Sequence, residues 1–222
     1  MIIVDYNKKH HEQIIAAAVK ALKAGKVVAY PTDTSYGLAV DANNIRAIKK
    51  LYLIKGRNFN KPAHVVAPSV AYAKKIARWN KNSSRLAKKF WPGALTLVLP
   101  VAARRGVPLH RLTANTGFIG IRFPDNQIAQ GLAKHLKCPI TATSANLSGG
   151  NDCYSADEII RQFSARGGKN HRYQPDIIIN AGKLPRQKPS TVVKVFGDAV
   201  KILRAGPITK KQINSLLNTK AY

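Results

Sequence analysis

Thiols are scarce in this chain. Among its 222 residues the cysteines are Cys138 and Cys153, too few for a disulfide framework or for a zinc site made of four thiolates. Hydrophobic runs are also short, since the longest, near residues 93–103, cannot span a bilayer. The start, Met1–Asp5, lacks the basic segment and apolar run of a secretory signal. We therefore expect a protein of the reducing cytoplasm with no membrane partner.

The common nucleotide and hydrolase motifs are absent as well. The sequence contains neither a Gly-x-x-x-x-Gly-Lys-Ser/Thr phosphate loop nor a Gly-x-Gly-x-x-Gly turn. It has no Gly-x-Ser-x-Gly elbow, and none of its six histidines stands in a recognisable base context, which disfavours a serine protease built on Ser144. Any phosphate must therefore be bound by individual side chains and backbone amides.

Acidic residues are few and unevenly placed. The formal net charge is +27, from 37 basic and 10 acidic residues. No acid occurs between Asp41 and Asp125, a stretch that carries seventeen Lys and Arg. Such a one-sided surface should attract nucleotide phosphates and polyanions such as tRNA or double-stranded RNA. The alternative is a solvated lysine face, which also occurs in proteins that bind no nucleic acid.

Apolar periodicity predicts a single α/β domain over residues 1–222. The hydrophobic content of 45% is enough for one sizeable core. Helical spacing covers residues 10–24, 43–54, 69–79, 84–90, 128–136, 156–163 and 209–217. Strands are expected over 27–31, 64–67, 95–99, 118–122, 139–143, 176–180, 191–195 and 200–203. This mixed order predicts a twisted, mixed, partly parallel sheet with helices on its faces.

Three polar segments are candidates for one pocket: Tyr30–Leu38, Lys55–Pro62 and Thr141–Asn146. Each places hydroxyls, an amide or cations where a regular element gives way to a loop, the usual position of ligand-binding residues in α/β proteins. Together they predict binding of an anion and an amino acid.

Lys55 and Arg57 suit an oligophosphate, because Arg offers a bidentate fork and Lys a compact charge. Gly56 between them permits close backbone approach, and Lys61-Pro62 stiffens the exit. The alternative is that both are ordinary solvated cations.

The hydroxyls of Thr143 and Ser144 and the amide of Asn146 can bind phosphate, carboxylate or amino groups. Helix capping or an Asx turn is the alternative for them. In the first segment, Thr32, Thr34, Ser35 and Tyr36 form a polar rim or simply a turn.

Seven segments in order carry a family resemblance that covers about residues 25–207. They are Pro-Thr-Asp-Thr-x-Tyr-Gly-Leu from residue 31, Lys-x-Arg from 55, Phe-Trp-Pro-Gly-Ala-Leu-Thr from 90, Ile-Arg-Phe-Pro from 121, Thr-Ser-Ala-Asn-Leu-Ser from 143, Pro-Ser-Thr-Val-Val from 189 and Arg-Ala-Gly from 204. The chain resembles the YrdC family of threonylcarbamoyl-adenylate synthases, in its short, single-domain form.

The resemblance implies a YrdC-like fold with a concave basic cavity and a defined reaction. L-Threonine, bicarbonate and ATP would give threonylcarbamoyl-AMP and pyrophosphate, and a downstream threonylcarbamoyl transferase complex would use the adenylate to modify tRNA next to the anticodon. No cofactor is expected to be tightly bound and no metal site is assigned; Mg²⁺ should arrive with ATP.

The resemblance also implies roles for individual residues. Lys55 and Arg57 would be catalytic, and Thr32 and Arg122 would bind threonine. The residues implied to bind ATP are Lys55, Arg57, Thr116, Ser144, Asn146, Ser190 and Arg204.

Some residues depart from the family pattern. Lys194 stands where an acid is common, Asn151–Tyr154 replaces the usual Pro and small hydroxyl residues, and His64 lies near a threonine-binding position without a role assigned to it. Two other functions stay open. One is a non-catalytic RNA-binding module, which would not consume ATP, and the other is the carbamoyl-transfer domain of hydrogenase maturation proteins, which is disfavoured because the chain has too few cysteines for their zinc-finger-like domains.

Overall fold

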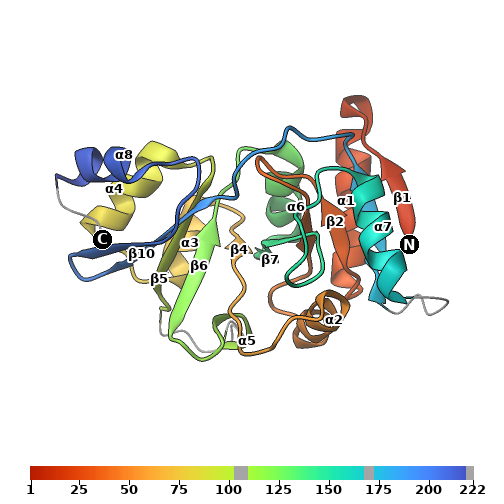
Figure 1. Ribbon diagram of the computed structural model, residues 1–222, viewed down its shortest axis with the longest axis horizontal. Helices are drawn as coiled ribbons and strands as arrows, with labels where there is room; N and C mark the ends of the chain where they lie inside the picture. The colour runs from red at the N-terminus through yellow and green to blue at the C-terminus, as the bar shows by residue number, and fades with distance from the viewer. Residues whose placement is uncertain (103–109, 168–172, 219–222) are drawn as a thin grey trace.

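The structure is a computed structural model that describes residues 1–102, 110–167 and 173–218. Its strands form two mixed sheets that lie side by side in Figure 1. The five-stranded sheet, on the right of the view, has the order β1 (Ile2–Asp5), β9 (Ile177–Asn180), β2 (Val28–Tyr30), β3 (Gly37–Ala39) and β8 (Thr143–Ser144). β1, β9 and β2 run parallel, whereas β3 pairs antiparallel with both β2 and β8.

The second sheet has six strands. Its order is β11 (Ala199–Arg204), β10 (Thr191–Phe196), β5 (Leu95–Pro100), β6 (Phe118–Arg122), β4 (Val65–Val66) and β7 (Ile140–Thr141). β10 pairs parallel with β5 and β4 pairs parallel with β6, while the remaining pairs are antiparallel.

Helices cover the two sheets. The five-stranded sheet is accompanied by α1 (His11–Lys23), which follows the short helix η1 (Lys8–His10), by α6 (Gln127–Leu136) and by α7 (Ala156–Gly167). The six-stranded sheet carries α3 (Val70–Ile76), α4 (Lys81–Phe90) and α8 (Lys210–Leu217), and the helices α2 (Ile45–Lys55) and α5 (His110–Thr113) lie at the lower edge of Figure 1. Side-chain caps define several helix starts, for example the Ser69 hydroxyl that accepts from the amide of Tyr72.

The chain passes between the sheets at residues 140–144. Thr141 belongs to β7 and Thr143 to β8, so this short segment joins one sheet to the other. The buried Thr141 hydroxyl donates to Leu38 O at 2.8 Å and accepts from Val40 N at 3.0 Å, and the Tyr30 hydroxyl donates to Thr141 O at 3.0 Å. These bonds satisfy the polar groups that two strand ends bring into the interior, and they fix the position of the polar segments on both sides of the junction.

The structure confirms the predicted class, a mixed, partly parallel α/β fold, and divides its strands into two sheets. Every predicted helix and strand is present within a few residues, although the predicted strand 139–143 is interrupted at Ala142 to form β7 and β8. β1, β3 and α5 were not predicted. In the described part of the chain, none of the helices is long and apolar enough to cross a bilayer.

Candidate substrate pocket

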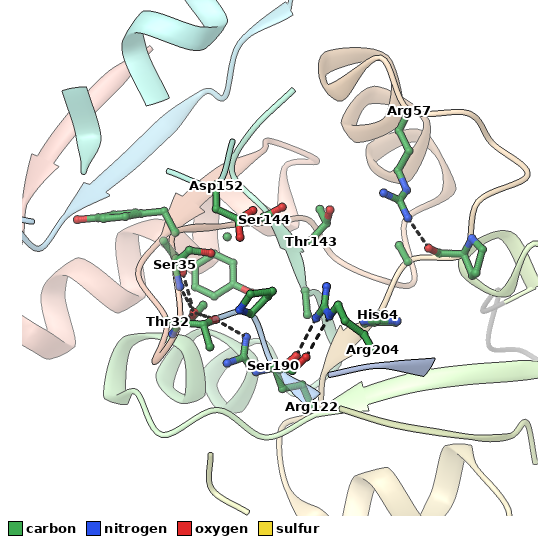
Figure 2. A pocket seen from close by; sticks show the side chains of 18 residues that line it. Thr32, Ser35, Arg57, His64, Arg122, Thr143, Ser144, Asp152, Ser190 and Arg204 are labelled. Atoms are coloured by element: carbon green, nitrogen blue, oxygen red, sulfur yellow. Dashed lines mark hydrogen bonds between the residues drawn. The ribbon is translucent and has the colours of Figure 1, made fainter. Parts of the chain in front are cut away.

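A polar pocket lies at the junction of the two sheets (Figure 2). Its walls come from the turn between β2 and β3, the segment before β4, the ends of β6, β8 and β11, and the segment that enters β10. Of the predicted site residues, six line it: Thr32, Arg57, Arg122, Ser144, Ser190 and Arg204. Thr34, Ser35, Tyr36 and Thr143, from the predicted polar segments, line it as well.

The hydroxyl of Thr32 stabilises the turn between β2 and β3. Thr32 Oγ1 accepts from the amides of Thr34 at 3.1 Å and Ser35 at 3.3 Å and donates to Ser35 O at 2.7 Å. Thr32 therefore shapes the turn, and the turn presents Thr34 and Ser35 to the pocket. The polar-rim and turn interpretations of this segment are both correct.

Arg122 ends β6 with its guanidinium held by the same turn. It forms an ion pair with Asp33 and donates to Thr34 Oγ1 at 3.0 Å. The two side chains of the pair are only 10% and 12% exposed. Burial lowers the pKa of Arg122, and Asp33 opposes that shift. The buried atoms Arg122 Nε and Asp33 Oδ2 have no hydrogen-bond partner among the described residues, so this pair retains unused hydrogen-bonding capacity beside the pocket.

Arg57 reaches the pocket because α2 ends sharply. Gly56 adopts a left-handed conformation with φ of 59° and caps the helix, which turns the chain outward. One Arg57 nitrogen donates to Pro62 O at 2.6 Å, and the guanidinium lies 5.9 Å from the centre of the Tyr52 ring. Its buried Nε has no hydrogen-bond partner in the part of the chain that the structure describes. The arginine is thus positioned while part of its fork remains available.

Lys55 lies behind the pocket wall and does not line it. It is 2% exposed, and its Nζ donates to the backbone oxygens of Ser144 and Asn146, the latter at 2.6 Å. A third contact joins Nζ to Asn146 Oδ1 at 3.3 Å. Burial and, to a smaller extent, Arg57 lower the pKa of Lys55 to about 7. In this arrangement the lysine ties α2 to the Ser144–Asn146 segment.

Arg204 and Ser190 form a second basic corner. Arg204 Nε donates to Ser190 O at 3.0 Å, and its terminal nitrogen donates to Ser190 Oγ at 3.1 Å. Ser190 Oγ also lies 2.8 Å from Thr96 Oγ1 on β5. Burial lowers the pKa of Arg204, while Asp152 raises it. These bonds fix the guanidinium on the wall opposite the β2–β3 turn.

Thr116 and Asn146 lie outside the residues that line the pocket. The Thr116 hydroxyl donates to Thr113 O at 2.7 Å and so stabilises the turn before β6. Asn146 accepts from the Ser144 hydroxyl and donates to Gly150 O. Both residues support segments near the pocket, and in the structure neither presents a free group to it.

Two pocket residues had no role assigned from sequence. His64 packs at the start of β4, and burial followed by Arg204, Arg57 and Arg122 lowers the pKa of its ring to about 4. Asp152, between α7 and the Ser144–Asn146 segment, is an acid that lines the pocket (Figure 2). A lone polar residue at the head of the apolar strand 64–67 was the available signal for His64; for Asp152 it was the departure of residues 151–154 from the family pattern.

A cleft where strand ends from two sheets meet and that three arginines line has the features expected of a protein that binds an anionic small molecule. The chain belongs to the Sua5/YciO/YrdC family, whose model, described as telomere recombination, matches residues 20–206. The resemblance found from the seven ordered segments is thereby confirmed.

Named relatives agree with this family. The threonylcarbamoyl-AMP synthase of Bacillus subtilis is 35% identical over 91% of this chain and 56% of its own length. A relative in Methanocaldococcus jannaschii, provisionally given the same name, is 33% identical over 93% of this chain and 92% of its own length. The chain thus spans little more than half of the Bacillus relative and nearly all of the Methanocaldococcus one.

Solved structures show the same fold. Pyrococcus abyssi Sua5 complexed with L-threonine superposes with a TM-score of 0.88 at 29% identity, covering 100% of this chain and 62% of that one. Escherichia coli YciO gives 0.77 at 29% identity, with 96% and 97% covered. Full-length HypF in a phosphate- and nucleotide-bound form gives 0.73 at 22% identity over 86% of this chain and 28% of that one, a likeness of fold alone.

Proposed function

We propose that this chain is an L-threonylcarbamoyladenylate synthase, a nucleotidyltransferase that makes threonylcarbamoyl-AMP and pyrophosphate from L-threonine, bicarbonate and ATP. The observation that carries the proposal is the meeting of Arg57, Arg122 and Arg204 in one pocket, from three distant parts of the sequence. Relatives named threonylcarbamoyl-AMP synthase and the threonine complex of Pyrococcus abyssi Sua5 support it.

Threonine is assigned to the wall formed by Arg122 and the β2–β3 turn. The guanidinium of Arg122 carries the charge that pairs with the substrate carboxylate. Thr34 and Ser35 offer hydroxyls on the same wall, while Thr32 holds their turn closed. His64, which is neutral above about pH 4, provides a hydrogen-bonding ring that adds no charge.

ATP is assigned to the wall formed by Arg57, Arg204, Ser144 and Ser190. Two arginines and two hydroxyls provide the donors that phosphate oxygens require. Lys55 and Asn146 act on the nucleotide indirectly, because they hold the segment that carries Ser144. Thr116, which lies outside the residues that line the pocket, is assigned a supporting role in the turn before β6.

The reaction proceeds in two steps. The amino group of threonine and bicarbonate form a carbamate with loss of water. A carbamate oxygen then attacks the α-phosphorus, and the bond to the β-phosphate breaks so that pyrophosphate leaves with its electron pair. Bicarbonate, ATP and the carbamate are anionic and threonine carries a carboxylate, so the arginines contribute by positioning these groups and neutralising their negative charge. No covalent enzyme intermediate is needed.

Pyrophosphate release tests this function. We expect release only when threonine, bicarbonate and ATP are all present, together with a product of the mass of threonylcarbamoyl-AMP. ATP turnover that ignores threonine would refute the assignment, and the absence of any ATP consumption would favour the RNA-binding module instead.

The product would then serve a downstream threonylcarbamoyl transferase complex in the cytoplasm, which modifies the adenosine next to the tRNA anticodon. The adenylate is a small diffusible molecule, so its synthesis requires no bound tRNA. Binding of tRNA or double-stranded RNA is a separate property that we assign to the basic exterior.

A further inference from the structure

Asp152 places a negative charge in a pocket otherwise built for anions. The other charged side chains that line the pocket in the described part of the chain are Arg57, Arg122 and Arg204. Asp152 lines the same pocket as Ser144, which is assigned to ATP, and both are labelled in Figure 2. A triphosphate entering there would meet a carboxylate as well as cations.

The backbone around Asp152 is firmly held. Cys153, the next residue, is fully buried, and its carbonyl accepts from Tyr36 N at 2.9 Å. Tyr154 N donates to Glu158 Oε2 at 2.6 Å, and Tyr154 O accepts from Leu184 N at 2.7 Å. These bonds join the segment to β3, to α7 and to the chain that leads to β10. The carboxylate is therefore presented from a fixed position.

The Asp152 carboxylate itself forms no hydrogen bond or ion pair within residues 1–102, 110–167 and 173–218. Its charge acts on Lys55 and Arg204, and it raises the pKa of both. The acidic charge that acts on Arg122 is instead that of Asp33, its ion-pair partner. Asp152 thus belongs electrostatically to the nucleotide side of the pocket and not to the threonine side.

Lys55 and Arg204 interact with the Asp152 charge without forming an ion pair with it, so the carboxylate would still repel a nearby polyphosphate unless a cation lay directly between the two groups. Mg²⁺ is suited to this position, because it is typically bound through one or two carboxylates, substrate phosphates and several waters. The described residues include no group of three His, Cys, Asp or Glu that could hold a metal by themselves. A metal here would therefore depend on oxygens from the nucleotide.

We propose that Asp152 binds the Mg²⁺ ion that arrives with ATP, so that the ion joins this carboxylate to the triphosphate. The inference rests on the proposed function, since it requires ATP in this pocket. It also gives a role to one residue of the segment Asn151–Tyr154, where the family usually has Pro and small hydroxyl residues.

The test is calorimetric measurement of the ATP dissociation constant with excess Mg²⁺ and with EDTA. In the wild type, Mg²⁺ should tighten ATP binding. Asp152→Asn keeps the shape and removes the charge, so it should weaken binding of MgATP by about tenfold, the effect of one contact to a charged group. The same variant should bind metal-free ATP more tightly than the wild type does, because the repulsion is gone.

Asp152→Ser, which restores a small hydroxyl, should behave like Asp152→Asn. Asp198→Asn, in the exposed turn between β10 and β11, is the matched control for loss of one negative charge and should change neither constant. With Mn²⁺ in place of Mg²⁺, electron paramagnetic resonance should detect bound Mn²⁺ in the wild type only when ATP is present, and less of it in Asp152→Asn.

The outcomes separate this inference from the proposed function. If ATP binds to no form of the protein, with or without metal, both fail. If ATP binds and Asp152→Asn tightens MgATP and metal-free ATP equally, Asp152 is only a repulsive charge, and the metal role alone is overturned.

Discussion

Two cations two residues apart have different tasks in this structure. Arg57 lines the pocket, whereas Lys55 is buried and directs its donors to the backbone oxygens of Ser144 and Asn146. The left-handed Gly56 between them separates the two directions. Although Lys55 and Arg57 belong to the same Lys-x-Arg segment, only Arg57 is placed to contact a ligand in the pocket.

Arg57→Ala should weaken ATP binding, and Arg122→Ala should mainly raise the threonine concentration needed for half-maximal rate. Losing a hydrogen bond to a charged ligand group costs roughly 1.5 to 3 kcal/mol, which is a factor of about ten to a hundred in affinity. Calorimetry with ATP and a threonine titration of pyrophosphate release measure the two effects. Arg46→Ala, an exposed arginine on the same helix as Lys55, is the control and should leave both unchanged. Unchanged nucleotide affinity in Arg57→Ala would move the phosphate site elsewhere.

The buried charge of Lys55 should make stability depend on pH. In the native state its pKa is about 7, whereas the ordinary value of 10.5 applies when the chain is unfolded. Between these values the unfolded chain holds more protons, so the free energy of unfolding rises with pH. From pH 7 to pH 9 this one group should add about 2 kcal/mol.

Chemical denaturation at pH 7, 8 and 9 measures this slope. Lys55→Met should be less stable overall, because the oxygens of Ser144 and Asn146 lose their donor, but its stability should rise less steeply with pH than that of the wild type. Lys49→Met, an exposed lysine of the same helix, should keep the wild-type slope. Equal slopes in all three proteins would show that Lys55 does not change its protonation on unfolding in this range.

At the scale of elements, the pairing of β4 with β6 decides where His64 lies. Val65 is the register partner of Ile121, which brings Gly120 beside His64. A Cβ on Gly120 would lie 2.2 Å from His64 Cδ2 and 2.8 Å from Cγ. The His64 ring occupies space that only a glycine at position 120 leaves open. The residue at this position of β6 therefore determines where the ring lies in the pocket wall.

Gly120→Ala should therefore displace the His64 ring and weaken threonine use about tenfold, if the ring contributes one good hydrogen bond. A threonine titration of pyrophosphate release measures the effect, and circular dichroism checks that the fold is retained. In a His64→Ala background the Gly120→Ala change should add little, because the clashing ring is gone. A full additional loss in the double variant would mean that Gly120 acts through the sheet instead.

The elements that the sequence predicted are those with local signals. Helices such as α1 and α6 have buried positions at helical spacing, and α8 begins beside the predicted start at residue 209, where Thr209 caps it. The four residues of β1 lack such a signal, since Ile2 and Ile3 are exposed and the strand exists only by pairing with β9, about 175 residues later. The division into two sheets depends on the same kind of distant pairing.

The site residues were likewise predictable only where a local sequence signal exists. Arg57, Arg122, Ser144 and Arg204 were found because each stands in a recognisable segment. The direction of the Lys55 side chain could not be predicted, because it is set by oxygens that are about 90 residues away. The His64 ring fits against Gly120, and the segment of Asp152 is held by the bond from Tyr36 N to Cys153 O, so both positions depend on contacts between residues far apart in the sequence.

At the scale of the whole molecule, the basic excess exceeds what the small substrates require. Lys74 and Lys75 on α3 and Lys88 and Lys89 on α4 are exposed, lie outside the pocket, and belong to the stretch without acids. Both helices accompany the six-stranded sheet. This arrangement can attract a polyanion without engaging the residues assigned to ATP and threonine.

We predict that RNA binds this surface with little sequence preference and a steep dependence on salt, since phosphate contacts release counterions. Changing Lys74, Lys75, Lys88 and Lys89 to glutamate should lower the affinity for tRNA and for double-stranded RNA and flatten the salt slope. Filter binding between about 50 and 200 mM salt measures the slope over the range where several phosphate contacts become visible. Pyrophosphate release should stay nearly unchanged.

The matched control changes four exposed lysines on the other half of the molecule: Lys8, Lys9, Lys20 and Lys23, on η1 and α1. Both variants lose the same charge, so an effect of net charge alone would weaken RNA binding equally in the two. A localised site predicts a larger loss and a flatter salt slope in the α3–α4 variant, because a phosphate contact acts within about a Debye length, near 10 Å at 0.1 M salt. If RNA does not bind at low salt, or if its binding does not respond to salt at all, the prediction of a polyanion-binding surface is wrong. The excess positive charge would then have no assigned ligand.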